Sequence, residues 1–175
     1  QAAGRLPAGW SYVLPTESEW EYACRAGTTT AYSWGNSIAS SYANYNWDGA
    51  WNTGSDFNQP RDVGQYAANP WGFFDMHGNV REWTADHFQA EYPSGNVTDP
   101  TGPVSGASRV MRSGSWHHND PYLRSAKRLS VSPDSRHGAQ GFRLAFRQTS
   151  PPPPITDANF TTAINLWFSD EANAT

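Results

Sequence analysis

The chain has 175 residues, of which 37% are hydrophobic and 14% aromatic, and its formal net charge at pH 7 is −4. This composition excludes a core built mainly from leucine and isoleucine, and the lack of any Lys/Arg run argues against a nucleic-acid surface. A single cysteine excludes an intramolecular disulfide, and no segment reaches the roughly 18 apolar residues that a membrane span needs.

The clearest predicted element is a helix within residues 14–27, LPTESEWEYACRAG. Thr16 and Glu19 have the spacing of a capping box, in which side chain and backbone satisfy each other's hydrogen bonds at the helix start. Gly27 is suited to end the helix. Three residues at i, i+3 and i+4 are expected to face the core: Trp20, Ala23 and Cys24. Cys24 is therefore expected to be a buried small hydrophobic residue and not a nucleophile.

Residues 28–72 show neither helical nor strand periodicity, and their many Gly, Asn, Asp and Pro residues favour turns. A stretch of this length without regular structure needs something to order it inside a domain. Its Asn and Asp side chains are satisfied either by backbone turns or by a hard cation.

Three strands are predicted after this loop, within residues 79–86, 108–116 and 140–148. In the first, Val80, Glu82 and Thr84 alternate with Arg81, Trp83 and Ala85. In the last, one face is expected to carry three apolar side chains: Phe142, Leu144 and Phe146. A polar loop is expected between the second and third strands.

The sequence TSPPPP at 149–154 predicts a stiff polyproline II linker. Beyond it, residues 155–175 predict an amphipathic helix that is too short to be a domain. It is expected to begin a further module or to dock on a partner, including another copy of the chain. Because the sequence begins without Met and without a signal peptide, it is expected to be a piece of a longer protein.

Four islands, in order, resemble one known family: LPTESEWEYACRAG, NPWGFFDMHGNVREWTAD, RVMRSGSW with LRSAKR, and GFRLAF. From about residue 5 to 147 the chain is similar to the C-terminal two-thirds of the formylglycine-generating enzyme, or sulfatase-modifying factor, domain. The resemblance implies one such domain over residues 1–148. It implies an α+β, loop-rich fold with low regular secondary structure that is related to C-type lectins.

Enzymes of this family oxidise a substrate cysteine with two copper-binding cysteines that follow the segment matching GSW here. Neither cysteine is present: His118 stands at the first position, and the loop is shorter at the second. Ser115 matches an active-site serine of the family. Copper(I) prefers soft thiolate ligands, which imidazoles do not replace. Adjacent His117 and His118 are also expected to diverge, which disfavours a histidine-bound iron site.

The resemblance also implies a calcium site at the segment DMHGNVREW, residues 75–83. Its ligands would be the Asp75 and Glu82 side chains with the carbonyls of Gly78 and Val80. Oxygen donors of this kind suit a hard cation, and glycine lets the backbone turn its carbonyl inward. The alternative is a plain turn whose Glu82 pairs with an arginine, such as Arg112 or Arg124. A second calcium site is implied at four further positions: Asn44, Tyr45 (carbonyl), Asp56 and Asn58 (carbonyl).

The segment 116–140 lies where C-type-lectin-like relatives present ligand-binding residues. Its candidates combine aromatic anchors with polar groups: Trp116, His118, Asn119, Asp120, Tyr122 and Arg124. The alternative is an ordinary polar loop whose arginines, with Arg128 and Arg143, brace the core.

Three functions follow as expectations. The first is a non-catalytic, calcium-stabilised binding or adhesion module for a protein or carbohydrate ligand, carried by a secreted or surface-exposed multidomain bacterial protein. The second is a structural or assembly subunit of a surface layer or filament. The third is a metal-dependent, oxidase-type enzyme of the same family.

Overall fold

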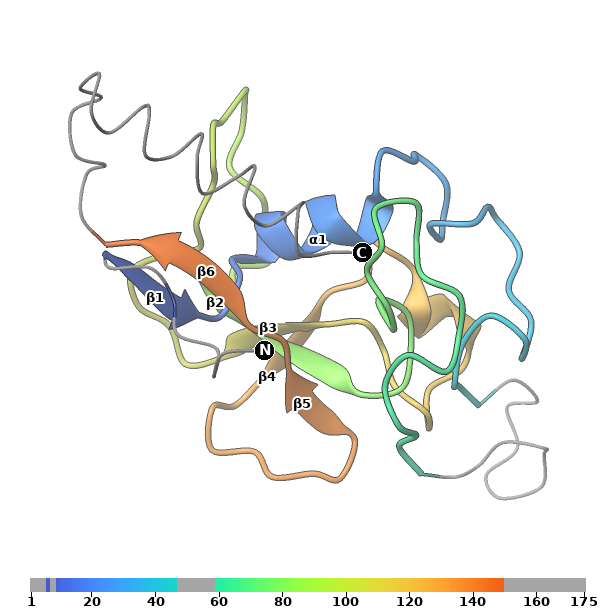
Figure 1. Cartoon of the computed structure of the whole chain (residues 1–175). Coiled ribbons are helices and arrows are strands. Elements are labelled where there is room, and N and C mark those ends of the chain that lie inside the picture. Colours follow the sequence, from blue (N-terminus) through green and yellow to red (C-terminus); the bar gives the residue numbers. More distant parts are fainter. Residues whose placement is uncertain (1–5, 7–8, 47–58, 150–175) are drawn as a thin grey trace. The chain divides into compact units, whose positions relative to one another are not determined.

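The computed structural model describes residue 6 and residues 9–46 and 59–149. Short elements joined by long loops make up this part of the chain (Figure 1). In order they are β1 (Trp10–Val13), α1 (Glu17–Arg25), β2 (Arg81–His87), β3 (Arg109–Arg112), the 3-10 helix η1 (Asp120–Leu123), β4 (Leu129–Val131), β5 (Gln140–Phe142) and β6 (Ala145–Gln148). The predicted mixture of helix and strand with little regular structure is confirmed. The predicted proline linker from residue 150 onward and the 155–175 helix lie outside the described residues.

The chain forms two compact units. One contains residues 1–12 and 146–175, and its described part is the pairing of β1 with β6. There the rings of Tyr12 and Phe146 lie 5.3 Å apart, and the Thr149 N–H donates to the Gly9 carbonyl at 2.7 Å. The other unit contains residues 13–145 and holds α1, the four-stranded sheet and every site considered below. In the described residues no helix has the length and apolar character that crossing a bilayer requires.

Helix α1 forms as its capping signals predict. The Thr16 hydroxyl accepts from the Glu19 N–H at 3.2 Å, and the Glu19 carboxylate accepts from the Thr16 N–H at 2.7 Å. Trp20 and Cys24 are buried, while Ala26 and Gly27 take the left-handed conformation that ends the helix. The helix therefore presents Trp20 and Cys24 to the core, as the 3.6-residue period indicates.

The main sheet has the strand order β4–β3–β2–β5, in which β2 pairs antiparallel with β3 and parallel with β5. The face of β2 that is buried is polar: Glu82, Thr84 and Asp86. Each of these side chains has a hydrogen-bond partner; for example, the Thr84 hydroxyl donates to the Val110 carbonyl at 3.2 Å. Burial of polar groups is tolerated because these bonds replace those to water.

The prediction of one strand over 140–148 was wrong. Two short strands, β5 and β6, belong to different sheets, with Arg143 and Leu144 between them. Arg143 turns its guanidinium to the buried Glu82 carboxylate, and Phe142 stays 64% exposed. The polar loop expected before these strands also contains two elements that were not predicted from the sequence, η1 and β4.

Aromatic rings pack with small and aliphatic side chains in the core of the second unit. One cluster consists of Tyr32, Ala43, Tyr45 and Leu123, and another of Trp20, Cys24 and Met76. A buried charge network joins β3 to α1, because Arg112 pairs with Glu17 at 2.7 Å and with Glu21 at 2.5 Å. The core is thus held by aromatic packing together with ion pairs that no apolar pattern predicts.

Candidate functional site

The predicted calcium segment forms a sharp turn immediately before β2. Asp75, Gly78 and Asn79 all have positive φ, at 55°, 85° and 60°. A Cβ on Gly78 would lie 2.5 Å from the Asn44 carbonyl oxygen, so no other residue fits without movement of the backbone. Glycine is therefore required here for a close approach as well as for its left-handed conformation.

Glu82 is the most constrained carboxylate of the turn. Its Oε2 accepts from Trp20 Nε1 and from Arg143 Nε, both at 2.6 Å, and its Oε1 accepts from Arg143 Nη2 at 2.7 Å. An arginine partner agrees with the alternative drawn from the sequence, but it is Arg143 and neither Arg112 nor Arg124. Two oxygens provide about four acceptor positions, so one on Oε1 remains for a further ligand.

The other three predicted ligands line the same cavity as Glu82. This cavity has a volume of about 370 Å³, and its walls include Asp75, Gly78, Val80 and Arg143. Asp75 Oδ2 accepts from the Gly64 N–H at 2.7 Å, and the Gly78 carbonyl accepts from the Ser113 hydroxyl at 2.9 Å. A carbonyl oxygen has two lone pairs and a carboxylate about four, so both groups keep capacity for a cation.

The second predicted calcium set is only partly described. Asn44 and Tyr45 are buried beside the turn, whereas Asp56 and Asn58 lie outside the described residues. The Asn44 side-chain amide donates to the Gln59 carbonyl at 3.0 Å and to Asn79 Oδ1 at 3.2 Å. Asn44 thereby connects the long loop to the turn of the first set.

The described residues contain no cluster of side chains of the kind that binds a transition metal. Within the ranges 9–46 and 59–149, no three side chains drawn from His, Cys, Asp and Glu are placed to hold one metal ion. The predicted calcium set contains only two such side chains and takes its other donors from the backbone. Its oxygen-only chemistry is that of hard cations.

Backbone hydrogen bonds attach the predicted ligand loop to this turn. The Gly78 N–H donates to the Ser113 carbonyl at 2.8 Å, and the Trp116 N–H donates to the Asn79 carbonyl at 2.9 Å. Farther along, the His118 carbonyl accepts from the Asn46 N–H at 2.9 Å. The N-terminal base of the loop is therefore fixed by main-chain contacts with the turn and with Asn46 of the long loop.

The predicted ligand residues lie on one short stretch that includes η1. Asn119, Asp120 and Arg124 are exposed, and Tyr122 is 36% exposed. The half-buried His118 ring stacks on Tyr122, with centroids 4.7 Å apart and ring planes 15° apart. The Trp116 indole is half-buried, and its Nε1 atom is buried without a hydrogen-bond partner. Leu123 is fully buried in the core and anchors this stretch.

The expectation that His117 and His118 diverge was wrong. Their rings lie 4.4 Å apart, and the His137 ring lies 5.2 Å from His117. The buried Ser115 hydroxyl is hydrogen-bonded to Nδ1 of both neighbours, at 3.0 Å for His117 and 2.8 Å for His118. Burial, followed by the nearby His117, lowers the pKa of His118 to about 4, so its imidazole is neutral at pH 7.

The single cysteine of the chain, Cys24, lies apart from these histidines and is buried. Cys24 is completely buried in α1, and burial raises the pKa of its thiol to about 12. Its sulfur lies 3.7 Å from the Met76 carbonyl oxygen and 3.6 Å from His77 Nε2. Because the thiolate is the reactive form, Cys24 behaves as a packing residue, as its helical position predicts.

One cavity has no counterpart among the sites predicted from the sequence. It lies against α1 and the C-terminal end of β2, with Glu17, Glu21, Tyr22 and Arg128 among its lining residues. The acidic pair at i and i+4 on α1, Glu17 and Glu21, is the only signal of it in the sequence. That signal is also typical of a solvated helix face.

Comparison with known proteins gives consistent matches. Residues 1–148 match the family model of the sulfatase-modifying factor enzyme 1-like domain. The chain is 38% identical over 143 residues to formylglycine-generating enzyme of Mus musculus, covering 75% of this chain and 38% of that protein. It is 40% identical over 143 residues to the enzyme of Streptomyces coelicolor, covering 75% of this chain and 46% of that protein. It is 37% identical over 136 residues to serine/threonine-protein kinase pkn1 of Chlamydia caviae, covering 75% of this chain and 20% of that protein.

Solved structures agree. Treponema denticola variable protein 1 superimposes with a TM-score of 0.67 at 35% identity, over 78% of this chain and 48% of that chain. PvdO from Pseudomonas aeruginosa gives a TM-score of 0.63 at 27% identity, over 78% of this chain and 52% of that chain. The chain thus spans less than half the length of these curated relatives and about half of these structures.

Proposed function

This chain belongs to the sulfatase-modifying factor enzyme 1-like family, and on that premise we propose that it is a non-catalytic binding or adhesion module. The observation that carries the proposal is the chemistry of the loop after β3. The position that resembles a copper-binding cysteine of the enzymes is His118, whose ring is stacked on Tyr122. The one cysteine of the chain, Cys24, is buried in α1 with a strongly raised pKa.

The proposed ligand surface is the stretch from Trp116 to Arg124. It combines a tyrosine and a tryptophan with exposed amide, carboxylate and guanidinium groups, a mixture common at recognition sites. Its base is ordered by main-chain hydrogen bonds, so little conformational entropy remains to be lost on binding. The ligand class that fits is a protein or carbohydrate surface contacted by a small, pre-ordered patch.

Calcium is proposed as the stabilising ion of the turn at residues 75–82. Asp75, Glu82 and the carbonyls of Gly78 and Val80 would hold it, and the ion would supply positive charge between two carboxylates. Arg143 already neutralises one of them, so the predicted affinity is in the weak range of about 10⁻⁴ M that extracellular modules show. A second ion at Asn44 and Tyr45 belongs to the same proposal.

A setting in a larger, secreted or surface-exposed protein is proposed as well. The match to the Chlamydia caviae kinase covers only 20% of that protein, so a domain of this family forms a small part of a longer chain there. The proline-rich segment after residue 149 suits a linker between modules.

Binding to immobilised glycans and surface proteins tests the proposal. The full chain is screened beside Trp116→Ala and Tyr122→Ala, with the exposed Tyr42→Ala as a matched control. Ligands bound by the wild type and the control, but at least tenfold more weakly by both loop variants, support the ligand surface. Ligands bound equally by all four proteins, or no ligand at all, would contradict it.

A metal-dependent enzyme is the second candidate, favoured by the contact of Ser115 with two imidazoles and by the nearby His137. Elemental analysis of the purified native protein separates the two functions. If the protein contains one equivalent of copper or iron and oxidises a cysteine-containing peptide, the enzyme function is supported and the binding-module proposal is rejected. Absence of both leaves the binding module as the better proposal. Sedimentation of the same sample measures self-assembly, which the second function expected from the sequence, an assembly subunit, requires.

A further inference from the structure

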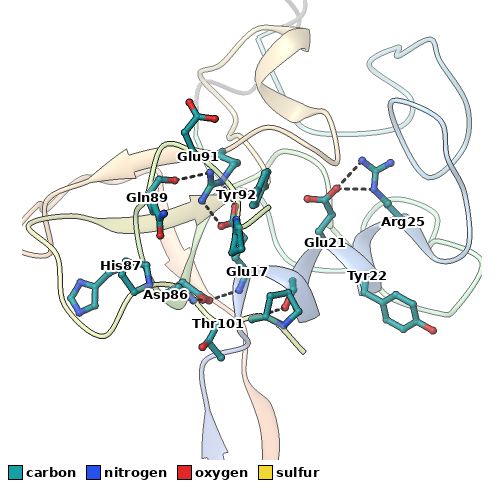
Figure 2. A pocket seen from close by; sticks show the side chains of 16 residues that line it. Glu17, Glu21, Tyr22, Arg25, Asp86, His87, Gln89, Glu91, Tyr92 and Thr101 are labelled. Atoms are coloured by element: carbon teal, nitrogen blue, oxygen red, sulfur yellow. Dashed lines mark hydrogen bonds and ion pairs between the residues drawn. The ribbon is translucent and has the colours of Figure 1, made fainter. Parts of the chain in front are cut away.

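The cavity beside α1 is separate from both sites described above. Its volume is about 320 Å³, within the size range of small-molecule pockets. Figure 2 shows its lining side chains, which come from α1, from the end of β2, from the loop that follows β2 and from Arg128 just before β4. None of the residues of the turn at 75–82 or of the loop at 116–124 contributes to it.

Hydrogen bonds join the segments that frame this cavity. The buried Asp86 carboxylate accepts from the Glu17 N–H at the start of α1 and from the Gly102 N–H of the loop. The Ser18 hydroxyl donates to the Pro100 carbonyl at 2.8 Å. The helix, β2 and the loop around residue 100 are thus joined by three hydrogen bonds.

The walls are largely apolar and aromatic. Two tyrosine rings and three prolines are among the lining residues: Tyr22, Tyr92, Pro93, Pro100 and Pro103. Tyr22 is 71% exposed and Tyr92 is 59% exposed, but the Arg128 guanidinium already lies over the Tyr92 ring, 4.3 Å from its centroid. The Tyr22 ring is therefore the more accessible of the two. Trp71 packs edge-on against Tyr22 at 4.8 Å and limits its movement. Exposed tyrosine faces attract apolar groups and also cations.

The charges of the lining favour a positive ligand. The lining contains four carboxylates and two guanidinium groups: Glu17, Glu21, Asp86 and Glu91 with Arg25 and Arg128. Arg112, behind the lining, also pairs with Glu17 and Glu21, so four carboxylates against three guanidinium groups leave an excess of one negative charge. Arg128 is fully engaged, because it pairs with both oxygens of Glu17 at 2.6 and 2.7 Å and donates to the Gln89 carbonyl at 2.8 Å. Arg25 is paired with Glu21 at 2.8 Å, as the dashed lines in Figure 2 mark.

Glu91 is the carboxylate available to a ligand. It is exposed at the cavity, and in the described part of the chain no hydrogen bond or ion pair engages it. An anionic ligand would find the arginines of the cavity already paired with glutamates, and it would be repelled by the Glu91 carboxylate. A cation would meet the carboxylate and the tyrosine rings, an attraction worth more where water is partly excluded.

We propose that this cavity binds a small organic cation, an ammonium or guanidinium group attached to an apolar or aromatic body. The body would lie against Tyr22, Tyr92 and the prolines, and the charged group would lie toward Glu91. This site is independent of the proposed function, because it shares no residue with the loop or the turn.

Three probes of similar size and different charge test the inference on the full chain: phenethylamine, 2-phenylethanol and 3-phenylpropanoate. Titration is followed by calorimetry and by amide chemical shifts. The amine is expected to bind at least tenfold more tightly than the carboxylate, with the alcohol between them. Its affinity is expected to fall as NaCl rises, since an exposed charge pair is screened.

Two variants and a control locate the site. Glu91→Gln is expected to lower the affinity for the amine several-fold and leave that for the alcohol unchanged, whereas Tyr22→Ala is expected to weaken both. Tyr42→Ala, an exposed tyrosine outside the cavity, is expected to change neither. Equal or tighter binding of the carboxylate, affinities unchanged in both variants, or no saturable binding of the amine would overturn the inference.

Discussion

Arg143 is the residue on which the buried Glu82 depends. It supplies two of the three hydrogen bonds to that carboxylate, and the side chain of Glu82 is only 7% exposed. Arg143→Gln is expected to lower the free energy of unfolding by about 3 kcal/mol without added metal, because it leaves a buried charge uncompensated. Urea denaturation in EDTA measures this loss.

Arg136→Gln is the matched control, since Arg136 is exposed and contacts only carbonyls of its own loop. Equal stability of the two variants would mean that the ion pair with Glu82 contributes little. Added calcium is expected to restore part of the stability of Arg143→Gln, because a bound cation would compensate the same carboxylate.

His118 makes the folded state sensitive to acid. Burial and the adjacent His117 lower its pKa to about 4, below the ordinary value of 6.5. The neutral form is favoured in the folded protein, so its contribution to stability is present above pH 6.5 and is lost as pH falls through 4. Denaturation midpoints measured at pH 7.5 and pH 5 are expected to differ less in His118→Asn than in the wild type.

His77, whose pKa burial also lowers to about 4, leaves part of this dependence in the variant. His87→Asn serves as the control, since His87 belongs to β2 and not to the histidine cluster of His117, His118 and His137. An unchanged pH dependence in His118→Asn would contradict the assignment.

At the level of elements, Asp86 joins β2, the start of α1 and the loop at Gly102. Its two carboxylate oxygens accept one backbone N–H each. Asp86→Asn preserves the shape but can accept only one of them and removes a negative charge from the helix N-terminus. We expect a loss of about 2 kcal/mol in unfolding free energy.

Chemical denaturation checks this value against Asp134→Asn, an exposed aspartate, which is expected to lie within about 0.5 kcal/mol of the wild type. A loss in Asp86→Asn no larger than that of the control would show that the junction contributes little.

The sequence predicted correctly those elements that depend on interactions between residues close together in the chain. The capping box, the positions of Trp20 and Cys24 and the glycine at the end of α1 are read correctly because they involve neighbours in the chain. The break between β5 and β6 could not be predicted, since it follows from Arg143 reaching Glu82, 61 residues away in sequence. Likewise, the alternation in β2 predicts a strand, but not that its polar side is the buried one.

The candidate sites also divide into one that is local in sequence and others that are formed by distant segments. The turn at 75–82 is a local motif, and the four predicted ligands line one cavity. The histidine cluster joins the adjacent His117 and His118 to His137, and the cavity beside α1 combines the helix with residues 86–103 and Arg128. Both therefore bring together segments that are apart in the sequence, and the Glu17/Glu21 pair is only a partial signal of the cavity. Arg112 illustrates the limit: it is fully buried between two glutamates of α1, and its sequence context resembles that of any strand arginine.

At the scale of the whole molecule, calcium is expected to raise the thermal stability. With 1 mM calcium and a dissociation constant of about 10⁻⁴ M, the gain is about 1.4 kcal/mol, or a few degrees in melting temperature. Thermal scans with calcium and with EDTA measure it, and Asp75→Asn and Glu82→Gln are expected to reduce the difference. Identical melting temperatures of the wild type in both buffers would contradict the calcium proposal.

The attachment of the loop after β3 has a consequence for protein engineering. Its base is held by Gly78, Asn79 and Asn46 through main-chain atoms, which every substituted residue except proline would also provide. The exposed positions between Asn119 and Tyr122 therefore form a segment in which a library of foreign sequences can be displayed while Leu123 stays fixed in the core. Substitution at this tip is expected to leave the fold intact for the same reason.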